Sequence, residues 1–304
     1  MADLFEILIG NEGEKDYKKK PVIVQGITGK FGSFHTQQMI AYGTNIVAGV
    51  TPGKGGQKFE NVSIYETVKE AVVATGAKIS IVFVPAKFFR DAAIGALEAG
   101  IKLLIAIPEH VPVRDAITIL ELAKNKDAIM IGPNTPGIIV PGIIKIGIMP
   151  ATPFKPGRIA VLSRSGTLMY EVSHNLSVAN FGQSVSLGIG GDPINGTTVI
   201  EAFDMIRKLD IDGVVVVGEI GGDAEELLAQ HIIDTKFDKP VVAYIAGRAA
   251  PKEKKMGHAG AIIYGTYGSA ESKVSMYAKA NVPVAKRPAE VAMLLAGKLG
   301  GKKG

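Results

Sequence analysis

The stretch Pro21-Val-Ile-Val-Gln-Gly-Ile-Thr-Gly-Lys-Phe-Gly32 combines a short apolar strand, a loop rich in glycine and the start of a helix. A parallel strand that is buried on both faces typically reads as a continuous β-branched run of this kind. The same alternation continues along the chain, and strands that alternate with helices of ten or more residues predict parallel βαβ units. The sequence therefore predicts an α/β fold built on doubly wound parallel sheets.

The alternation occurs twice, with one interruption between Gly132 and Gly157. Six prolines in this interval disfavour a helix, so we expect a crossover or linker there. The length of 304 residues suits two domains of roughly 150 residues each. We therefore expect one domain over residues 1–134 and a second over residues 135–304.

The expected elements follow the apolar periodicity. In the first half they are strands over 21–24, 45–50, 78–84, 102–107 and 128–131, and helices over 32–42, 65–74, 87–99 and 113–124. In the second half they are strands over 158–162, 183–187, 213–217 and 240–245, and helices over 166–180, 197–208, 224–233, 269–280 and 288–299. Ligand sites in such sheets lie beyond the carboxyl ends of the strands, where this sequence places its glycine clusters.

Composition excludes several classes of protein. A hydrophobic fraction of 47% with 21% charged residues is typical of a globular chain and excludes a disordered one. The absence of cysteine excludes disulfides and thiolate metal sites, and it favours a reducing compartment such as the cytoplasm. The net charge of +5 is scattered, which favours anionic small molecules over nucleic acid as partners. No apolar run is long enough for a membrane span, and the first residues lack the features of a signal peptide.

The first glycine loop suggests a phosphate-containing ligand. Gly26, Gly29 and Gly32 follow the first strand, and the next helix offers its N-terminal amides to an anion; the alternative is an ordinary tight turn. The spacing differs from the G-x-G-x-x-G fingerprint. The second strand leads to Lys54, where an NAD site needs an acid, so NADP or coenzyme A is favoured over NAD.

The loop around Lys54 is not an ATP-phosphate loop. Gly55 stands where a P-loop needs Ser or Thr to contact magnesium, and the spacing between the glycines is one residue short. Because no other segment offers such a cradle, any ATP chemistry would require the nucleotide to be held by another chain.

A histidine and a carboxylate suggest chemistry in the second half. His258 lies in Met256-Gly-His-Ala-Gly260, where small neighbours predict a ring presented on a loop; an ordinary loop histidine is the alternative. Glu219 follows a strand in Gly218-Glu-Ile-Gly-Gly222. A carboxylate that accepts from Nδ1 would fix the tautomer and leave Nε2 free to attack. The alternative role for Glu219 is a helix-entry acid that the helix dipole favours.

An anion site is expected at the start of the helix that follows strand 158–162. Ser165, Gly166 and Thr167 offer hydroxyl groups and backbone amides there, although an ordinary N-cap is the alternative. An anion site, a carboxylate and a histidine together suggest a phosphorylated-histidine site.

The chain resembles the alpha subunits of succinyl-CoA synthetase. The motifs that carry the resemblance occur in the family's order and span nearly the whole chain: Gly26-Ile-Thr-Gly29, Val50-Thr-Pro-Gly-Lys-Gly-Gly56, Gly132-Pro-Asn-Thr-Pro-Gly137, Ser163-Arg-Ser-Gly-Thr167, Gly188-Ile-Gly-Gly-Asp-Pro193, Gly218-Glu-Ile-Gly-Gly222 and Gly257-His-Ala-Gly-Ala261. The resemblance implies an N-terminal Rossmann-like domain that binds CoA and a C-terminal flavodoxin-like ligase domain. It also implies a hetero-oligomer with a beta subunit, whose ATP-grasp domain holds Mg-ATP or Mg-GTP.

The resemblance also implies roles for individual residues. It makes His258 the phosphorylated residue, Glu219 the carboxylate that orients it, and Ser165, Gly166 and Thr167 the phosphate-binding residues. The positions that it assigns to CoA are Thr28, Gly29, Lys30, Phe31, Lys54, Ile107, Pro108 and Glu109. Tyr170 matches a position near the organic acid, and no metal site is expected in this chain.

The implied reaction is a reversible ligation of an acid to CoA through a phosphohistidine and an acyl phosphate. The chain departs from the family's pattern at Thr135, where a cysteine is frequent, at Ile143 and Ile144, and in an insertion over Asn11 to Lys20. The alternatives are the related citryl-CoA synthetase and ATP-citrate lyase, an NADP-dependent oxidoreductase, and a non-catalytic CoA sensor. An oxidoreductase would leave Glu219 and His258 without a role.

Overall fold

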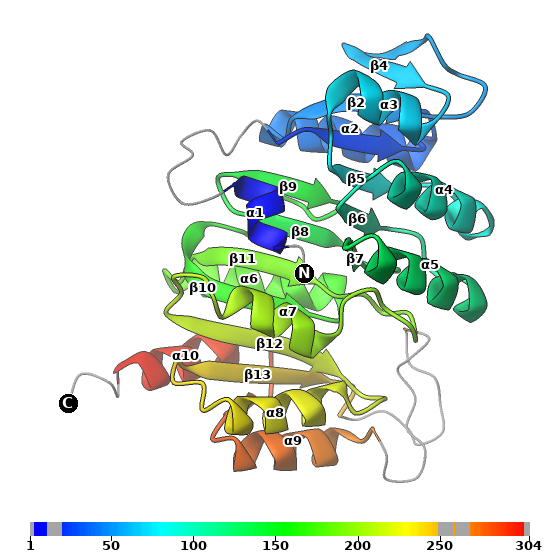
Figure 1. Ribbon diagram of the computed structural model, residues 1–304. Coiled ribbons are helices and arrows are strands. Elements are labelled where there is room, and N and C mark those ends of the chain that lie inside the picture. The colour runs from blue at the N-terminus through cyan, green and yellow to red at the C-terminus, as the bar shows by residue number, and fades with distance from the viewer. Residues whose placement is uncertain (1–2, 11–19, 249–257, 259–267, 301–304) are drawn as a thin grey trace. The chain divides into compact units, whose positions relative to one another are not determined.

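The computed structural model describes residues 3–10, 20–248, 258 and 268–300 (Figure 1). Contacts along the chain divide it into two compact units. The first comprises Met1–Ile139, Ile143–Ile148 and Ile194–Thr197, and the second comprises Val140–Gly142, Met149–Pro193 and Thr198–Gly304. The expected boundary between residues 134 and 135 stays a prediction. Most of the insertion over Asn11 to Lys20 and the neighbours of His258 lie outside the described residues.

The first sheet has the strand order of a dinucleotide-binding fold. Its strands are β1 (Val22–Gln25), β2 (Ile46–Val50), β3 (Lys58–Phe59), β4 (Val62–Tyr65), β5 (Ile79–Val82), β6 (Leu103–Ala106) and β7 (Ile129–Ile131). They are arranged as β3-β4-β2-β1-β5-β6-β7, and every pairing except that of β3 with β4 is parallel. Without the short β3, this is the Rossmann order 3-2-1-4-5-6.

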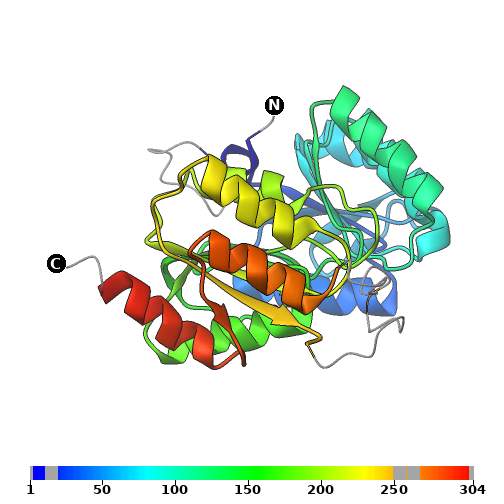
Figure 2. The same cartoon turned by 90° about the horizontal axis from the view of Figure 1, so that it is seen from below.

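Helices cover both faces of the first sheet. They are α2 (Lys30–Tyr42), α3 (Val68–Thr75), α4 (Ala86–Glu98) and α5 (Val113–Asn125), and the short α1 (Leu4–Ile9) precedes them. The helices α3, α4 and α5 pack in a row on one face, and α2 lies on the other (Figure 1, Figure 2). Phe89 of α4, which is fully buried, anchors the core beneath this row.

The second sheet has the strand order of a flavodoxin-like fold. Its strands are β8 (Gly137–Val140), β9 (Ile144–Gly147), β10 (Pro156–Ser163), β11 (Gln183–Gly188), β12 (Gly213–Glu219), β13 (Val241–Ala246) and β14 (Val284–Ala285). They are arranged as β14-β13-β12-β10-β11-β8-β9. The five strands from β10 to β14 follow the order 2-1-3-4-5 of doubly wound flavodoxin-like sheets.

Among the residues that the structure describes, five helices of the second unit cover this sheet on two faces. They are α6 (Gly166–Val178), α7 (Val199–Ile206), α8 (Ala224–Asp234), α9 (Ala270–Lys279) and α10 (Glu290–Gly300). Figure 2 shows α8 and α9 on one face and α10 with α6 on the opposite face. Every residue of β12 is buried, as expected for a β-branched central strand.

The prediction of an α/β chain with two doubly wound sheets is therefore confirmed, but two local predictions are wrong. The interval 132–157 is not only a linker, because β8 and β9 lie within it. Its prolines exclude a helix but are compatible with strand ends, and all six lie outside these two strands. The helix expected over 65–74 begins only at Val68, because the Thr67 side chain caps it by accepting from the Glu70 amide.

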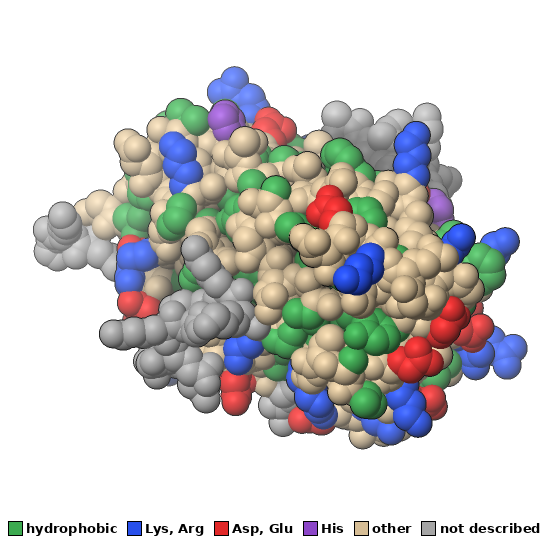
Figure 3. All heavy atoms as spheres, turned by 90° about the horizontal axis from the view of Figure 1, so that it is seen from above, with side chains coloured by type: hydrophobic (Ala, Val, Ile, Leu, Met, Phe, Trp, Pro, Cys, Tyr) green, Lys and Arg blue, Asp and Glu red, His purple; other side chains and the backbone are tan. Residues whose placement is uncertain are grey.

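The surface carries mixed charges. On the face shown in Figure 3, Lys and Arg side chains lie singly among acidic, apolar and neutral ones. Across the described residues, none of the helices combines the length and the apolar character needed to cross a bilayer.

Candidate active site

The carboxyl ends of three neighbouring strands form the site in the second unit. The strand β10 lies between β11 and β12, with Ser163 paired with Gly188 on one side and Val217 on the other. The chain leaves these strands through segments 164–165, 189–193 and 220–223, which lead towards α6, α7 and α8. The side chains of these segments therefore gather at one edge of the sheet, where doubly wound folds bind their ligands.

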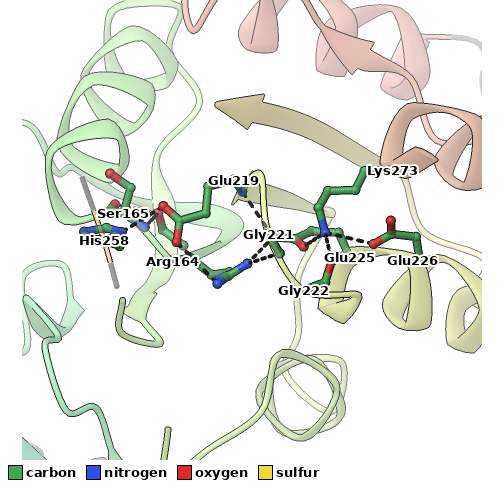
Figure 4. Close-up of polar contacts among 10 residues, drawn as sticks. Arg164, Ser165, Glu219, Gly221, Gly222, Glu225, Glu226, His258 and Lys273 are labelled. Atoms are coloured by element: carbon green, nitrogen blue, oxygen red, sulfur yellow. Dashed lines mark hydrogen bonds and ion pairs between the residues drawn. The ribbon is translucent and has the colours of Figure 1, made fainter. Parts of the chain in front are cut away.

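His258 lies at this edge and is held by Glu219. The ring Nδ1 lies 2.8 Å from Glu219 Oε2, a hydrogen-bond distance (Figure 4). Because Glu219 is a carboxylate acceptor at the end of β12, the proton of a neutral ring belongs on Nδ1, which leaves Nε2 with its lone pair. The histidine side chain is 27% exposed and Glu219 is 8% exposed, so the ring is half-buried and not fully presented to solvent as the small neighbours suggested.

The surroundings of His258 favour its protonated form. The hydrogen bond to Glu219 raises the pKa of His258; burial lowers it, and the charge of Glu219 raises it further. The charge of Arg164 works against this rise and that of Asp192 supports it, so the pKa lies above its ordinary value. A negative environment of this kind stabilises positive charge on an imidazole ring.

Gly191, the second glycine of the pair that follows β11, leaves room for the imidazole of His258. A Cβ atom at this position would lie 2.5 Å from Cγ and 2.6 Å from Cδ2 of His258. The backbone of Gly191 therefore forms a flat surface against which the imidazole packs. The ring thus contacts the segment after β11 and the last residue of β12, and these two strands flank β10 on either side.

The segment after β10 begins α6 between these two flanking segments. Ser165 is the N-cap, and its hydroxyl accepts from the Leu168 amide at 3.4 Å. The same serine is tied to β10, because Ser163 Oγ donates to its carbonyl at 2.6 Å. The helix dipole favours an anion at this end, where Gly166 and Thr167 follow the cap. Figure 4 draws Ser165 in the part of the site that contains His258.

Tyr170 lies one turn further along α6. Its ring packs edge-on against Phe154, with the centroids 6.2 Å apart. Burial raises the pKa of the Tyr170 hydroxyl to about 12, so it stays protonated and can donate a hydrogen bond.

The glycine loops of the first unit are tied to each other. Gly29 is the N-cap of α2 and brings no side chain to the first helical amides. Thr28 Oγ1 donates to Thr51 Oγ1 at 3.2 Å, and the Gly26 amide donates to the Val50 carbonyl at 2.8 Å. Lys30 is exposed at the start of the helix, so this helix terminus suits an anionic ligand.

Sequence reasoning missed a carboxylate that holds the loop around Lys54. Glu66, just after β4, accepts from the amides of Gly53 at 2.7 Å and Gly55 at 2.6 Å. These two backbone hydrogen bonds lower the pKa of Glu66. The loop therefore already holds an internal anion on its amides, and exposed Lys54 is the group that can meet an external one.

The other expected residues of the first unit lie at the same sheet edge. Phe31 is 51% exposed and packs edge-on against His35, with the ring centroids 4.4 Å apart. The segment Ile107, Pro108 and Glu109 follows β6, which β5 separates from β1. Its first residue is buried, and Glu109 is exposed.

Sequence reasoning also missed the charged residues behind Glu219. Arg164 Nη2 lies 3.3 Å from Glu219 Oε1, and Arg164 is half-buried between two carboxylates. A signal was available in two helices. Glu225 lies on the same stripe as Leu228, Ala229 and Ile232, and Lys273 shares the buried stripe of α9. A charge at an apolar position of a helix indicates a buried partner.

The residues that the structure describes contain no group of three or more His, Asp or Glu side chains that could hold a metal ion. The groups that the site does bring together suit nucleophilic chemistry: an imidazole nitrogen, an orienting carboxylate and a helix N-terminus for an anion.

Known proteins resemble this chain over both halves. A family described as CoA binding domain matches residues 17–110, and a family described as CoA-ligase matches residues 162–282. The chain is 49% identical to succinate–CoA ligase (ADP-forming) subunit alpha of Aquifex aeolicus, over 90% of each chain. It is 49% identical to subunit alpha 2 of Archaeoglobus fulgidus, over 92% of this chain and 97% of that one.

Solved structures with lower identity share the fold. ATP citrate lyase from Methanothrix soehngenii, determined with citrate and coenzyme A, has a TM-score of 0.84 at 22% identity. That match covers 93% of this chain and 50% of the lyase chain, so this chain spans half of it. A dinucleotide-forming acetyl-coenzyme A synthetase from Ca. Korarchaeum cryptofilum has a TM-score of 0.72 at 18% identity, covering 96% of this chain and 61% of that one.

Proposed function

Because the chain belongs to the family of succinate–CoA ligase alpha subunits, we propose that it carries the phosphoryl group in the ligation of succinate to CoA. As a member of this family it is an acid–thiol ligase and uses CoA as a substrate. The observation that supports the phosphoryl-carrier role is the pair formed by His258 Nδ1 and Glu219 Oε2 at 2.8 Å. It supplies one oriented ring nitrogen at the sheet edge where α6 begins.

In the first step, the lone pair of His258 Nε2 attacks the γ-phosphorus of a nucleoside triphosphate. The bond from phosphorus to the bridging oxygen breaks, and the nucleoside diphosphate leaves with the electron pair. The ring becomes positively charged, and Glu219 stabilises it through Nδ1. The phosphoryl oxygens are held by the N-terminus of α6, through Ser165, Gly166 and Thr167.

In the second step, a carboxylate oxygen of succinate attacks phosphorus. The nitrogen–phosphorus bond breaks, its electrons return to the ring, and succinyl phosphate forms. In the third step, the CoA thiolate attacks the acyl carbon, the bond from that carbon to the phosphate oxygen breaks, and inorganic phosphate leaves. Tyr170, as a buried hydroxyl donor on α6, is assigned to the organic acid.

CoA is assigned to the glycine loops of the first unit. The first amides of α2, which begins at Lys30 after the Gly29 N-cap, suit the pyrophosphate. Exposed Lys54 suits the phosphorylated ribose, and the ring of Phe31 offers an apolar surface. Thr28, Ile107, Pro108 and Glu109 are assigned to the same site, because they lie at the same edge of the first sheet.

The nucleotide is assigned to a partner chain. The family name of subunit alpha implies a partner in a hetero-oligomer. We infer that this partner is a beta subunit whose ATP-grasp domain holds Mg-ATP or Mg-GTP, since the sequence has no P-loop of its own. The lack of cysteine supports a reducing compartment, the cytoplasm.

The test is phosphoryl transfer in the assembled complex. We expect the chain, purified with its partner, to take up radiolabel from [γ-³²P]ATP in an acid-labile, base-stable bond. His258→Asn should abolish the label, and succinate with CoA should discharge it from the wild type. Label that persists in His258→Asn would contradict the assignment, and discharge by citrate in place of succinate would identify citrate as the acid.

A further inference from the structure

A set of buried charges lies behind Glu219, outside the residues assigned so far. The side chains of Glu225, in the first turn of α8, and Lys273 of α9 are 1% and 0% exposed. Lys273 Nζ donates to Glu225 Oε2 at 2.5 Å, to Glu226 Oε2 at 2.8 Å and to the Gly222 carbonyl at 2.9 Å. Buried charges are costly unless they are paired and hydrogen-bonded, and the contacts of Lys273 meet both conditions.

Glu225 connects this set to Glu219. Its Oε1 accepts from the backbone amide of Glu219 at 3.1 Å and from Arg164 Nη1 at 3.3 Å. Arg164 in turn places Nη2 3.3 Å from Glu219 Oε1 and donates from Nη1 to the Gly221 carbonyl at 3.2 Å. Figure 4 shows this continuous path from Lys273 to His258. Glu225 therefore holds both the backbone of Glu219 and the cation that pairs with its side chain.

Gly218, which precedes Glu219, leaves room for the side chain of Glu225. A Cβ atom at Gly218 would lie 2.6 Å from Oε1 and 2.7 Å from Cγ of Glu225. The carboxylate of Glu225 thus lies directly on the backbone that carries Glu219. This close approach is a second observation, independent of the ion pairs, that joins the two glutamates.

The charges of the set are balanced for a cationic ring. Burial alone would raise the pKa of Glu225, but the charges of Arg164 and Lys273 outweigh it and hold that pKa below its ordinary value. Glu226 pairs with Lys273 and offsets its charge, so next to His258 the two carboxylates of Glu219 and Glu225 exceed the one cation of Arg164 by one negative charge. That charge complements the positive charge that forms on the imidazole when it is phosphorylated.

We propose that Glu225 is a positioning residue for phosphoryl transfer, which, held by Lys273, fixes Arg164 and the Glu219 backbone so that Glu219 stays on His258 Nδ1. This role rests on the proposed function of His258. The alternative is that Glu225 only neutralises the buried charge of Lys273. In that case Glu225 would have a structural role and would not affect how Glu219 holds His258.

Glu226 provides a matched control. It neighbours Glu225 in sequence and pairs with the same lysine, but in the described part of the chain it has no hydrogen bond or ion pair with Glu219 or Arg164. We expect Glu225→Gln to slow the labelling of His258 by [γ-³²P]ATP about tenfold or more, with the KM for ATP unchanged. Glu226→Gln should stay within about twofold of the wild type, because Lys273 keeps Glu225 and the Gly222 carbonyl as partners.

A second variant and a second readout separate positioning from loss of folding. Glu225→Gln combined with Lys273→Met removes one anion and one cation, so no new net charge is buried. In the ¹⁵N-histidine-labelled complex, the pKa of His258 measured by NMR should fall in both Glu225 variants and stay unchanged in Glu226→Gln. Wild-type labelling and titration in a folded Glu225 variant would overturn the positioning role. A wild-type complex that is never labelled on His258 would overturn the proposed function, and this role with it.

Discussion

Replacing Glu219 by glutamine isolates the effect of one charge on the reactive ring. The substitution keeps the size of the side chain and removes the carboxylate that lies 2.8 Å from His258 Nδ1. A hydrogen bond to a charged group contributes about 1.5–3 kcal/mol, and each 1.4 kcal/mol is tenfold in rate. We therefore expect Glu219→Gln to slow phosphorylation of His258 by about 10- to 150-fold. If the amide nitrogen of the substituted side chain faces Nδ1, the ring proton moves to Nε2 and the loss is larger, because Nε2 cannot then attack.

The structure also predicts the direction in which the pH profile of the labelling rate shifts in Glu219→Gln. The ring must be neutral to attack, so the rate rises as pH rises through the pKa of His258. In the wild type, the hydrogen bond to Glu219 raises that pKa, and burial and the charge of Arg164 oppose the rise. Without the carboxylate the opposing effects remain, so the pKa falls. The variant should show a lower plateau, with its acidic limb displaced towards lower pH.

The assay is rapid-quench labelling with [γ-³²P]ATP between pH 5 and 9, with the complex confirmed as folded at each pH. Another histidine–carboxylate pair in the same unit serves as a control, since Asp204 Oδ1 lies 2.9 Å from His231 Nε2. Asp204→Asn should leave the labelling rate and its pH profile unchanged. An unaltered plateau in Glu219→Gln, or an acidic limb at higher pH, would refute the reasoning.

Three further substitutions test other parts of the structure. Gly191→Ala should displace the ring of His258, because the new Cβ atom would lie 2.5 Å from Cγ; labelling should fall at least about tenfold while the affinity for CoA, measured by calorimetry, stays unchanged. Glu66→Gln should weaken CoA binding several-fold in the same assay, because one of two loop amides loses its charged acceptor, without changing labelling by ATP. Phe89→Ala should lower the free energy of unfolding by about 3–5 kcal/mol in urea titrations, because the ring is fully buried, whereas Phe88→Ala, at a half-exposed ring, should cost much less.

The sheets were predictable because their strands are short β-branched runs between turn residues. Both faces of β12 are covered, so its whole length is apolar and no alternation obscures it. The strands β8 and β9 were missed for a different reason. Gly137 and Gly147 lie so close to each other that no side chain fits at either, and such a close approach in space leaves no periodic signal in the sequence.

The parts of the site that follow single strands could be predicted from residue types. Glu219 ends one strand and Ser165 follows another, so topology alone places both at one edge. Arg164, Glu225 and Lys273 belong to separate elements, and only the packing of α8 and α9 brings them together. Their ion pairs depend on three-dimensional neighbours, which local patterns do not specify.

In the proposed mechanism, His258 lies between a negative pole formed by Glu219 and a positive pole formed by the N-terminus of α6. Phosphorylation places a dianionic group on one ring nitrogen while the ring itself gains positive charge, so a single uniform field cannot stabilise both. The Glu219 carboxylate faces Nδ1, and the N-terminal amides of α6 donate to the phosphoryl oxygens. The imidazole separates the two charges, so each pole stabilises one of them. Removing the negative pole should therefore impair formation of the phosphohistidine, while weakening the positive pole through Ser165→Ala should mainly shorten its lifetime once it is formed.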